Sequence, residues 1–217
     1  MSAAFGPKEL LDCYRRGVFP MAENRRDENL FLIDPEIRGV LPLDALHVPR
    51  RLARTLRAGR FSFTVDRDFP AVLRACAAPR PGREETWISA PIVRLYERLH
   101  EMGFAHSVET RIEGALVGGL YGVSLGGAFF GESMFSRERD ASKAAFVALA
   151  ARLIRGGYRL LDAQFWTDHL AQFGAIEMER AAFKKMLADA LAVDGDFFAL
   201  PEDASAGQLL QSITHTS

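Results

Sequence analysis

One glutamate stands in surroundings where a carboxylate is unusual. Glu132 follows two phenylalanines and a glycine, and Met134 and Phe135 come shortly after it. A charged side chain inside an apolar cluster loses its hydration at a large cost in free energy unless it is paired. A buried acid of this kind needs a cationic partner. The pattern therefore predicts that Glu132 lies beside a positively charged group.

A second pair of polar side chains ends a predicted strand. In the segment Leu-Leu-Asp-Ala-Gln-Phe at residues 160–165, strand alternation places Asp162 and Gln164 on one face and Leu161 and Ala163 on the other. Two polar groups at a strand end can converge on one substrate atom. A solvent-facing strand edge explains the same spacing equally well, so the pattern alone leaves both interpretations open.

Glycines recur in residues 116–136, where the alternation otherwise predicts strands. Glycine weakens a strand, so it often marks a bulge or the close approach of a ligand. A glycine-rich hairpin that binds nothing is the alternative, and composition does not decide between the two.

Nucleophilic and metal-dependent chemistry find little support. Ser133 departs from the Gly-x-Ser-x-Gly elbow of serine hydrolases, because Phe135 occupies the place of the last glycine. His100 and His106 lack the helical i, i+4 pairing with a glutamate that a zinc protease requires. We expect no metal site and interpret these histidines as core or surface residues.

A basic helix is predicted over residues 50–60. Arg50, Arg54 and Arg57 recur at i, i+4 and i+7 on one face, and leucines occupy another. With Arg15 and Arg16 in the preceding segment, this face could hold phosphates by charge. A merely solvated basic face is the alternative.

Composition bounds the class of protein. The chain has 217 residues, 48% hydrophobic and 25% charged, with a net charge of −1, which argues against bulk coating of nucleic acid but allows a local basic patch. Cys13 and Cys76 are too far apart in sequence for a disulfide framework or a close-spaced metal site. No stretch approaches the roughly 20 apolar residues of a membrane span and no secretory leader is evident. We expect a cytoplasmic protein with no membrane partner.

The elements that must position these side chains alternate between helices and strands. A short helix and a few apolar pieces predict a small α/β domain over residues 1–60, followed by a larger domain over residues 61–217. The elements predicted for the larger domain are a strand at 61–65, helices at 69–77 and 92–102, strands at 107–112, 116–123 and 128–135, a helix at 141–154, a strand at 158–163, and helices near 169 and at 179–191. This order resembles the GNAT-type acyltransferase fold. The prediction is thus an α/β (α+β) protein with a GNAT-like catalytic domain.

A series of motifs carries a more specific resemblance. They are Tyr-Arg-Arg-Gly-Val-Phe-Pro at 14–20, Thr-Trp-Ile at 86–88, Ala-His-Ser-Val-Glu at 105–109, Leu-Val-Gly-Gly-Leu-Tyr-Gly at 116–122, Gly-Glu-Ser-Met-Phe-Ser at 131–136, Ala-Ser-Lys at 141–143 and Leu-Asp-Ala-Gln at 161–164. Their types and order resemble the leucyl/phenylalanyl-tRNA-protein transferase family over roughly residues 11–187.

The resemblance implies an enzyme of the bacterial N-end rule. Such an enzyme moves leucine, and also phenylalanine or methionine, from the 3′ end of an aminoacyl-tRNA to the α-amine of proteins that begin with Arg or Lys, which marks them for degradation. It implies no cofactor, and we expect a monomer. The sequence before residue 141 lacks the Gln/Arg-x-x-Gly-x-Gly/Ala loop with which acetyltransferases hold CoA, and this favours a tRNA donor.

The resemblance also implies roles for particular residues. Positions matching Glu132, Asp162 and Gln164 bind the acceptor and assist peptide-bond formation, and Trp87 offers a flat face to the terminal adenine or the substrate. The remaining substrate-binding positions, most of them in an apolar pocket, are Leu120, Tyr121, Phe129, Met134, Phe146, Leu149 and Leu161. Their ordinary interpretation is core.

The chain departs from the family's pattern in three places. It begins close to the first motif, it has Leu32 and Ile33 where relatives carry two tryptophans, and Asp140 replaces an asparagine. The lost aromatic pair predicts altered tRNA affinity or donor choice. Two other functions remain compatible with the acidic residues: a CoA-dependent GNAT-type N-acetyltransferase, and a non-catalytic adaptor for basic N-termini.

Overall fold

The computed structural model describes residues 5–79, 82, 84–202 and 204–214. The helices are α1 (Pro7–Arg15), α2 (Arg50–Arg57), α3 (Phe69–Ala77), α4 (Ala90–Glu101), α5 (Ala141–Arg155), α6 (Asp168–Ala171), α7 (Arg180–Leu191) and α8 (Ala206–Thr214). The strands are β1 (Phe19–Met21), β2 (Phe31–Ile33), β3 (Ile37–Leu41), β4 (Ser62–Val65), β5 (Ala105–Ile112), β6 (Ala115–Leu125), β7 (Ala128–Ser136), β8 (Leu160–Gln164) and β9 (Ile176–Glu179).

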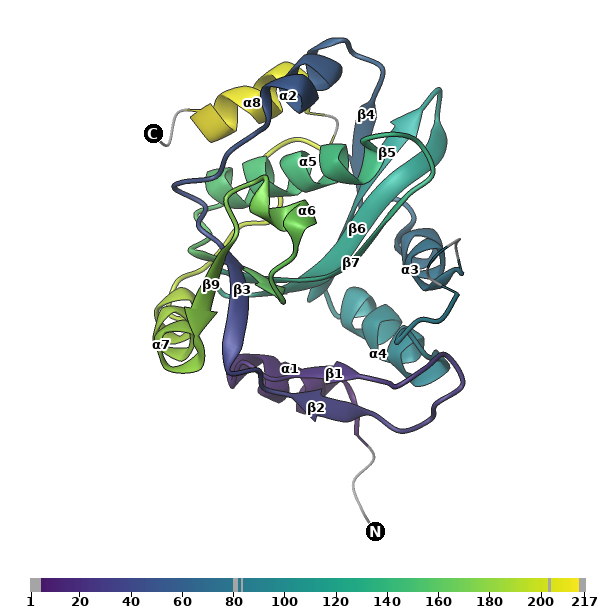
Figure 1. Ribbon diagram of the computed structural model, residues 1–217, viewed down its shortest axis with the longest axis vertical. Helices are drawn as coiled ribbons and strands as arrows, with labels where there is room; N and C mark the ends of the chain where they lie inside the picture. Colours follow the sequence, from purple (N-terminus) through teal and green to yellow (C-terminus); the bar gives the residue numbers. More distant parts are fainter. Residues whose placement is uncertain (1–4, 80–81, 83, 203, 215–217) are drawn as a thin grey trace.

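A mixed sheet forms the centre of the molecule (Figure 1). Within the described residues it has seven strands in the order β4-β5-β6-β7-β8-β3-β9, and β1 and β2 form a separate pair. The meander β5-β6-β7 is antiparallel, and β8 lies parallel to β7 after the crossover through α5. The predicted α/β class and the predicted order of helix, three strands, helix and strand are confirmed, and the resemblance of this order to a GNAT-like domain stays a prediction.

Helices cover both faces of this sheet (Figure 1). On one face α5 lies between the sheet and the pair α2 and α8, and on the other lie α1, α3, α4 and α7. Because α5 is enclosed from both sides, nearly all of its side chains are buried. Its many alanines allow that close packing, since small side chains let neighbouring backbones approach.

The strands β7 and β8 separate where the chemistry was expected. Their pairing runs from Ala128 opposite Leu160 to Phe130 opposite Asp162 and then stops, although β7 continues to Ser136. A fork between two parallel strands is a natural place for a substrate. Beyond the fork, β7 and β8 no longer pair with each other, although each still pairs with its outer neighbour.

A β-bulge lies on the β7 side of the fork. Tyr121 pairs with Ser133 and Gly122 with Gly131, so Glu132 is the extra residue between the two pairs. A Cβ on Gly122 would collide with the carbonyl oxygen of Phe130, so the strands can approach here only at a glycine. Bulges redirect side chains beside active sites, and this one accounts for Gly122, whereas Gly118 is required by the close approach of Ala141 on α5.

The first sixty residues contribute directly to the central sheet. Strand β3 lies between β8 and β9, and Gly39 allows close approach to the backbone of Phe165 and Trp166. The division into domains at residues 1–60 and 61–217 stays a prediction, and β3 lies on the N-terminal side of that boundary. The sequence analysis missed three of the described elements: strand β1, the edge strand β9 and the last helix, α8.

Candidate functional site

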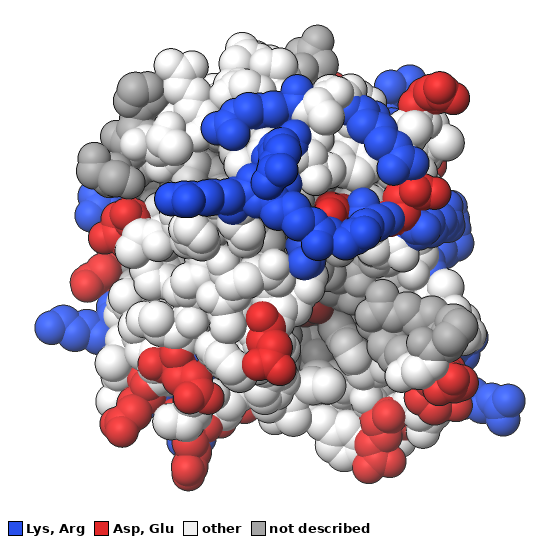
Figure 2. Space-filling view, turned by 45° about the horizontal axis from the view of Figure 1, so that its top comes forward, with Lys and Arg blue, Asp and Glu red and all other residues white. Residues whose placement is uncertain are grey.

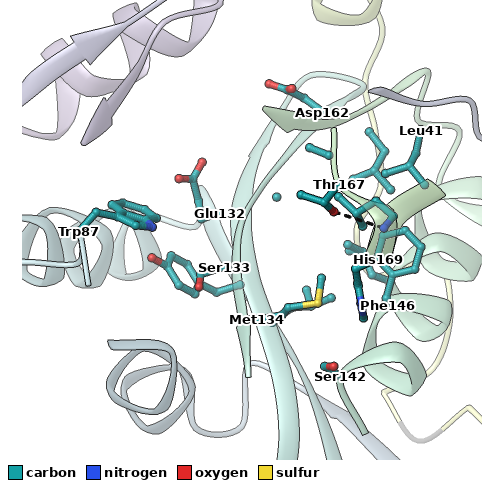
Figure 3. Close-up of a pocket in the computed structure, with 17 residues that line it drawn as sticks. Leu41, Trp87, Glu132, Ser133, Met134, Ser142, Phe146, Asp162, Thr167 and His169 are labelled. Atoms are coloured by element: carbon teal, nitrogen blue, oxygen red, sulfur yellow. Dashed lines mark hydrogen bonds between the residues drawn. The ribbon is translucent and has the colours of Figure 1, made fainter. Parts of the chain in front are cut away.

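A cavity of about 560 Å³ opens at the fork between β7 and β8. Figure 3 shows Trp87 and Glu132 on one side of β7, and Phe146 and His169 on the other. The cavity therefore has a polar end, on the side of α1 and α4, and an apolar end beside α5. A ligand with a charged group and a hydrocarbon group matches this division.

Glu132 lies at the polar end and is 8% exposed. Its Oε1 accepts hydrogen bonds from the Tyr14 hydroxyl at 2.7 Å and from Gln164 Nε2 at 2.9 Å, and its Oε2 accepts one from the Tyr96 hydroxyl at 2.8 Å. Burial raises the pKa of Glu132 to about 7, although the three donors pull it down. The prediction that a cation lies beside Glu132 is wrong for the described residues. Two neutral hydroxyls and an amide donate to this carboxylate instead.

The cation is found instead beside Asp162. Arg38, 1% exposed, donates to this carboxylate from Nε at 2.9 Å and from Nη2 at 2.6 Å. The guanidinium also donates to Gly17 O and lies over the rings of Phe19 and Phe183. Such a bidentate, fully enclosed pair fixes the carboxylate in place.

Gln164 connects the two acids. Its backbone N–H donates to Asp162 Oδ1 at 2.8 Å while its side chain donates to Glu132. Its φ of +64° is in the left-handed region, which non-glycine residues adopt rarely and mostly where surrounding contacts hold them. Within the described part of the chain the amide Oε1 accepts no hydrogen bond, so it is available to a substrate N–H group. Asp162 and Gln164, which were predicted to share one face of the strand, are thus joined directly by a hydrogen bond.

The apolar end contains most of the predicted pocket. Lining residues there include Leu120, Met134, Phe146, Leu149 and Leu161, and Trp87 and Tyr121 line the cavity nearer the acids. Phe129 is the exception. Its ring is fully buried and stacks on Phe197 at 5.6 Å, so it packs in the core and does not line the cavity.

Four further residues belong to the site and were not predicted: Tyr14, Arg38, Tyr96 and His169. Tyr14 opens the motif at residues 14–20 and Arg38 ends the segment Leu-Ile-Asp-Pro-Glu-Ile-Arg at residues 32–38, so position in these segments could have indicated both. Tyr96 gave no signal, because it sits among apolar residues on the buried face of α4.

His169 lines the cavity from α6. Its Nε2 is buried and has no hydrogen-bond partner among the described residues. Burial, and then the nearby Lys143, lower the pKa of this imidazole. The ring is therefore neutral near pH 7 and can exchange a hydrogen bond with a ligand.

The predicted tRNA-binding arginines fall into two groups. Arg50, Arg54 and Arg57 line the α2 side of a groove between α2 and α8. Figure 2 shows Lys and Arg side chains gathered in a band across the upper part of the molecule in that view. Arg15 and Arg16 lie on and just after α1, at the opposite end of the molecule (Figure 1). The two groups therefore do not form one surface.

Metal-binding clusters and disulfides are absent from the described residues. No group of three or more His, Cys, Asp or Glu is placed to hold a metal ion. Cys13 and Cys76 are both buried and are not joined in a disulfide. No described helix is long and apolar enough to cross a membrane.

Comparison with known proteins links this geometry to one family. Residues 40–188 match the model of the family described as leucyl/phenylalanyl-tRNA protein transferase. The chain is similar to proteins of that name from Caulobacter vibrioides (strain NA1000 / CB15N), 59% identical over 100% of both chains, and from Phenylobacterium zucineum (strain HLK1), 61% identical over 99% of this chain and 100% of the relative. Among solved structures, L-PGS from Bacillus licheniformis aligns with a TM-score of 0.43 and 16% identity over 75% of this chain and 55% of that one.

Proposed function

Because the chain belongs to the leucyl/phenylalanyl-tRNA protein transferase family, we propose that it transfers leucine, and also phenylalanine and methionine, from aminoacyl-tRNA to the α-amine of proteins that begin with Arg or Lys. The observation that carries this is the two-ended cavity at the fork, with two acids at one end and an apolar pocket at the other. The product would be an N-end rule degradation signal.

The chemistry asks the protein mainly for positioning. The nitrogen of the α-amine attacks the carbonyl carbon of the ester, the bond to the ribose oxygen breaks, and one amine proton is lost as that oxygen gains one. The ester is already activated, and an α-amine has a reference pKa of roughly 8, so a useful fraction is neutral near pH 7. Holding the two groups together supplies most of the remaining advantage.

Gln164 and Asp162 are the residues suited to the attacking amine. The Gln164 amide is oriented by its hydrogen bond to Glu132, which turns the acceptor atom Oε1 towards the N–H groups of the amine. Asp162 holds the backbone of Gln164 and helps the proton leave, and it is itself held by Arg38. Glu132 attracts the cationic group of the acceptor.

The apolar end is suited to the side chain of the donor. It is built from Leu120, Met134, Phe146, Leu149 and Leu161, which lack branching at Cβ and suit a γ-branched or aromatic guest. A difference of one methylene is worth only about 1 to 3 kcal/mol, so the preference for leucine is a matter of shape.

The tRNA would approach along helix α2. Its arginines can neutralise phosphates by charge, and Trp87 can stack on the terminal adenine, worth roughly 1 to 3 kcal/mol. We propose that the protein acts as a monomer. We place the reaction in the cytoplasm, where charged tRNA is present.

Label transfer tests this function. The purified protein is incubated with radiolabelled leucyl-tRNA and with peptides that begin with Arg, Lys, Asp or Ala, and label in the peptide is counted. Transfer to the Arg and Lys peptides is expected. Transfer to Asp alone would reassign the acceptor class, and acetylation from acetyl-CoA without any leucyl transfer would reject the donor.

Two variants test the residue roles in the same assay. Gln164→Ala and Asp162→Asn should each lower the rate about 10²- to 10³-fold, the usual cost of losing one positioned polar group. Glu109 is a buried glutamate on β5 that does not line the cavity. The matched control Glu109→Gln should therefore transfer leucine at the wild-type rate. An unchanged rate in Asp162→Asn would show that Asp162 has no part in the transfer.

A further inference from the structure

Three oxygen-bearing side chains close a triangle at the polar end of the cavity. Tyr14 from α1 and Tyr96 from α4 each contact the Glu132 carboxylate, at 2.7 and 2.8 Å, and their hydroxyl oxygens are 2.5 Å from each other. The tyrosines are fully buried and Glu132 is 8% exposed. Each of the three oxygen–oxygen distances is short enough for a direct hydrogen bond.

The triangle has more contacts than the two phenols have protons. A tyrosine hydroxyl carries one proton, so Tyr14 and Tyr96 together can serve two of the three oxygen–oxygen contacts. Burial, followed by the nearby Glu132, raises the pKa of both phenols well above the ordinary value, so neither gives up its proton. If Glu132 were ionised, one buried contact of 2.5 to 2.8 Å would hold two oxygens with no proton between them.

We propose that a third proton closes this ring: in the empty site Glu132 is a neutral carboxylic acid that donates to Tyr96, Tyr96 donates to Tyr14, and Tyr14 donates back to Glu132. Each of the three contacts then holds one proton. The Glu132 oxygen that accepts from Tyr14 also accepts from Gln164 Nε2, so the orientation of that amide is unchanged. Tyr14 and Tyr96 are positioning residues in this arrangement.

The charges around the ring agree with a neutral acid. Asp162 faces it from β8, and its negative charge opposes ionisation of Glu132. Arg38 on β3 is occupied by Asp162 and by Gly17 O. Tyr121 on β6 packs edge-on against Tyr96. Desolvation is the largest cause of the raised pKa of Glu132, and the ring provides hydrogen-bond partners for the neutral acid that desolvation favours.

A neutral acid changes how a basic acceptor is recognised, an inference that rests on the proposed function. When the ammonium or guanidinium group of an acceptor reaches Glu132, the ion pair forms only if the third proton leaves to solvent. Binding of the cation is therefore exchanged for one proton, and the phenols then both donate to the carboxylate. An empty site carries no unpaired charge at Glu132, while a cationic ligand creates the charge that holds it.

Infrared spectroscopy tests the ring without any ligand. At pH 6 the free protein should show the C=O stretching band of a protonated carboxylic acid, and the band should disappear as the pH is raised through about 7. Glu132→Gln should lack the band, and Glu109→Gln should keep it. A wild-type spectrum without the band, or a band unchanged in Glu132→Gln, would overturn the proposal.

Calorimetry tests the coupling to the acceptor. A peptide that begins with Arg is titrated into the protein at pH 6 in two buffers with different heats of ionisation, which reports the protons released. About one proton per bound peptide is expected, and the affinity should weaken up to about tenfold per pH unit below the titration of Glu132. Binding without proton release would overturn the coupling. If the peptide fails to bind while the infrared band is present, the acceptor assignment fails and the ring stands.

Discussion

The two strands of the fork each carry a buried acid, and the two acids are held in opposite ways. On the β8 side Asp162 is enclosed by a guanidinium that donates two hydrogen bonds. On the β7 side Glu132 is enclosed by two phenols and an amide, and its pKa rises to about 7. One acid has a permanent counter-ion in the protein, and the other has none among the described residues.

The difference separates an acid that is paired inside the protein from one that has no cation beside it among the described residues. A carboxylate with a built-in cation can orient a neighbour, as Asp162 does for the backbone of Gln164, without attracting a second cation. A carboxyl group with hydrogen-bond donors alone keeps its capacity for a cation from outside. The same residue class thus performs two tasks because its surroundings differ.

The largest effect should come from removing the permanent counter-ion. Arg38→Ala leaves Asp162 buried and unpaired, and breaking a buried ion pair costs about 3 to 5 kcal/mol of unfolding free energy. Urea unfolding measures it. Arg98→Ala is the control, because Arg98 and Glu101 form an exposed pair of a kind worth at most about 1 kcal/mol. A loss as small as that of the control would mean that Asp162 does not depend on Arg38.

A somewhat smaller effect should appear in the pH dependence of stability. A carboxyl whose pKa is raised on folding, here from 4.5 to about 7, binds more protons in the folded state between these values. Its stabilising contribution is therefore complete below pH 4.5 and is lost as the pH rises through 7. This shift corresponds to about 3 kcal/mol of unfolding free energy.

Urea midpoints of the wild type and Glu132→Gln between pH 4.5 and 8 measure this contribution. Wild-type stability should fall relative to the variant as the pH rises. A difference that is constant with pH, or that grows in favour of the wild type, would contradict the raised pKa.

The apolar end offers a third test, on specificity. Leu149→Ala removes a lining side chain, so leucine should lose about 1 to 3 kcal/mol of transition-state stabilisation while the larger phenylalanine loses less. Competing leucyl- and phenylalanyl-tRNA in one reaction measures the ratio. Phe129→Leu, a buried change outside the cavity, should lower stability and leave the ratio unchanged. An unchanged ratio in Leu149→Ala would place the donor elsewhere.

The smallest effect concerns the two arginine groups, which lie at opposite ends of the molecule. If Arg54 contacts a phosphate, Arg54→Ala should weaken tRNA binding and reduce the slope of log K against log salt by about 0.7 to 0.9. Arg15 pairs with Asp12 at 2.6 Å on the far end, so Arg15→Ala should leave the slope unchanged. Equal effects of the two variants would extend the tRNA surface to α1.

Much of the fold could be predicted because its signals are local. The meander β5-β6-β7, the helix α5 and the strand β8 follow patterns of alternation or helical period that do not depend on distant residues. Strand β9 could not be found, since its short exposed sequence is preceded and followed by helices. Helix α8 was missed as well, although its buried leucines do follow a helical period.

The candidate site divides in the same way. Glu132, Asp162 and Gln164 were identifiable as polar residues in apolar surroundings, and five of the six residues expected to form the apolar pocket line the cavity. Phe129 could not be separated from them, because adjacent positions on one face of a strand have the same pattern whether they meet a cavity or a core. Only the stacking on Phe197 distinguishes it.

By itself the sequence identified Glu132, Asp162 and Gln164 as candidate residues and, through strand alternation, predicted that Asp162 and Gln164 share a face. Tertiary structure decided which partner each acid receives. Tyr14 reaches Glu132 across 118 positions and Arg38 reaches Asp162 across 124, and a one-residue bulge directs Glu132 to the phenols. The physical reason is that charge and proton affinity depend on neighbours within a few ångströms, and those neighbours come from segments that only the folded chain brings together.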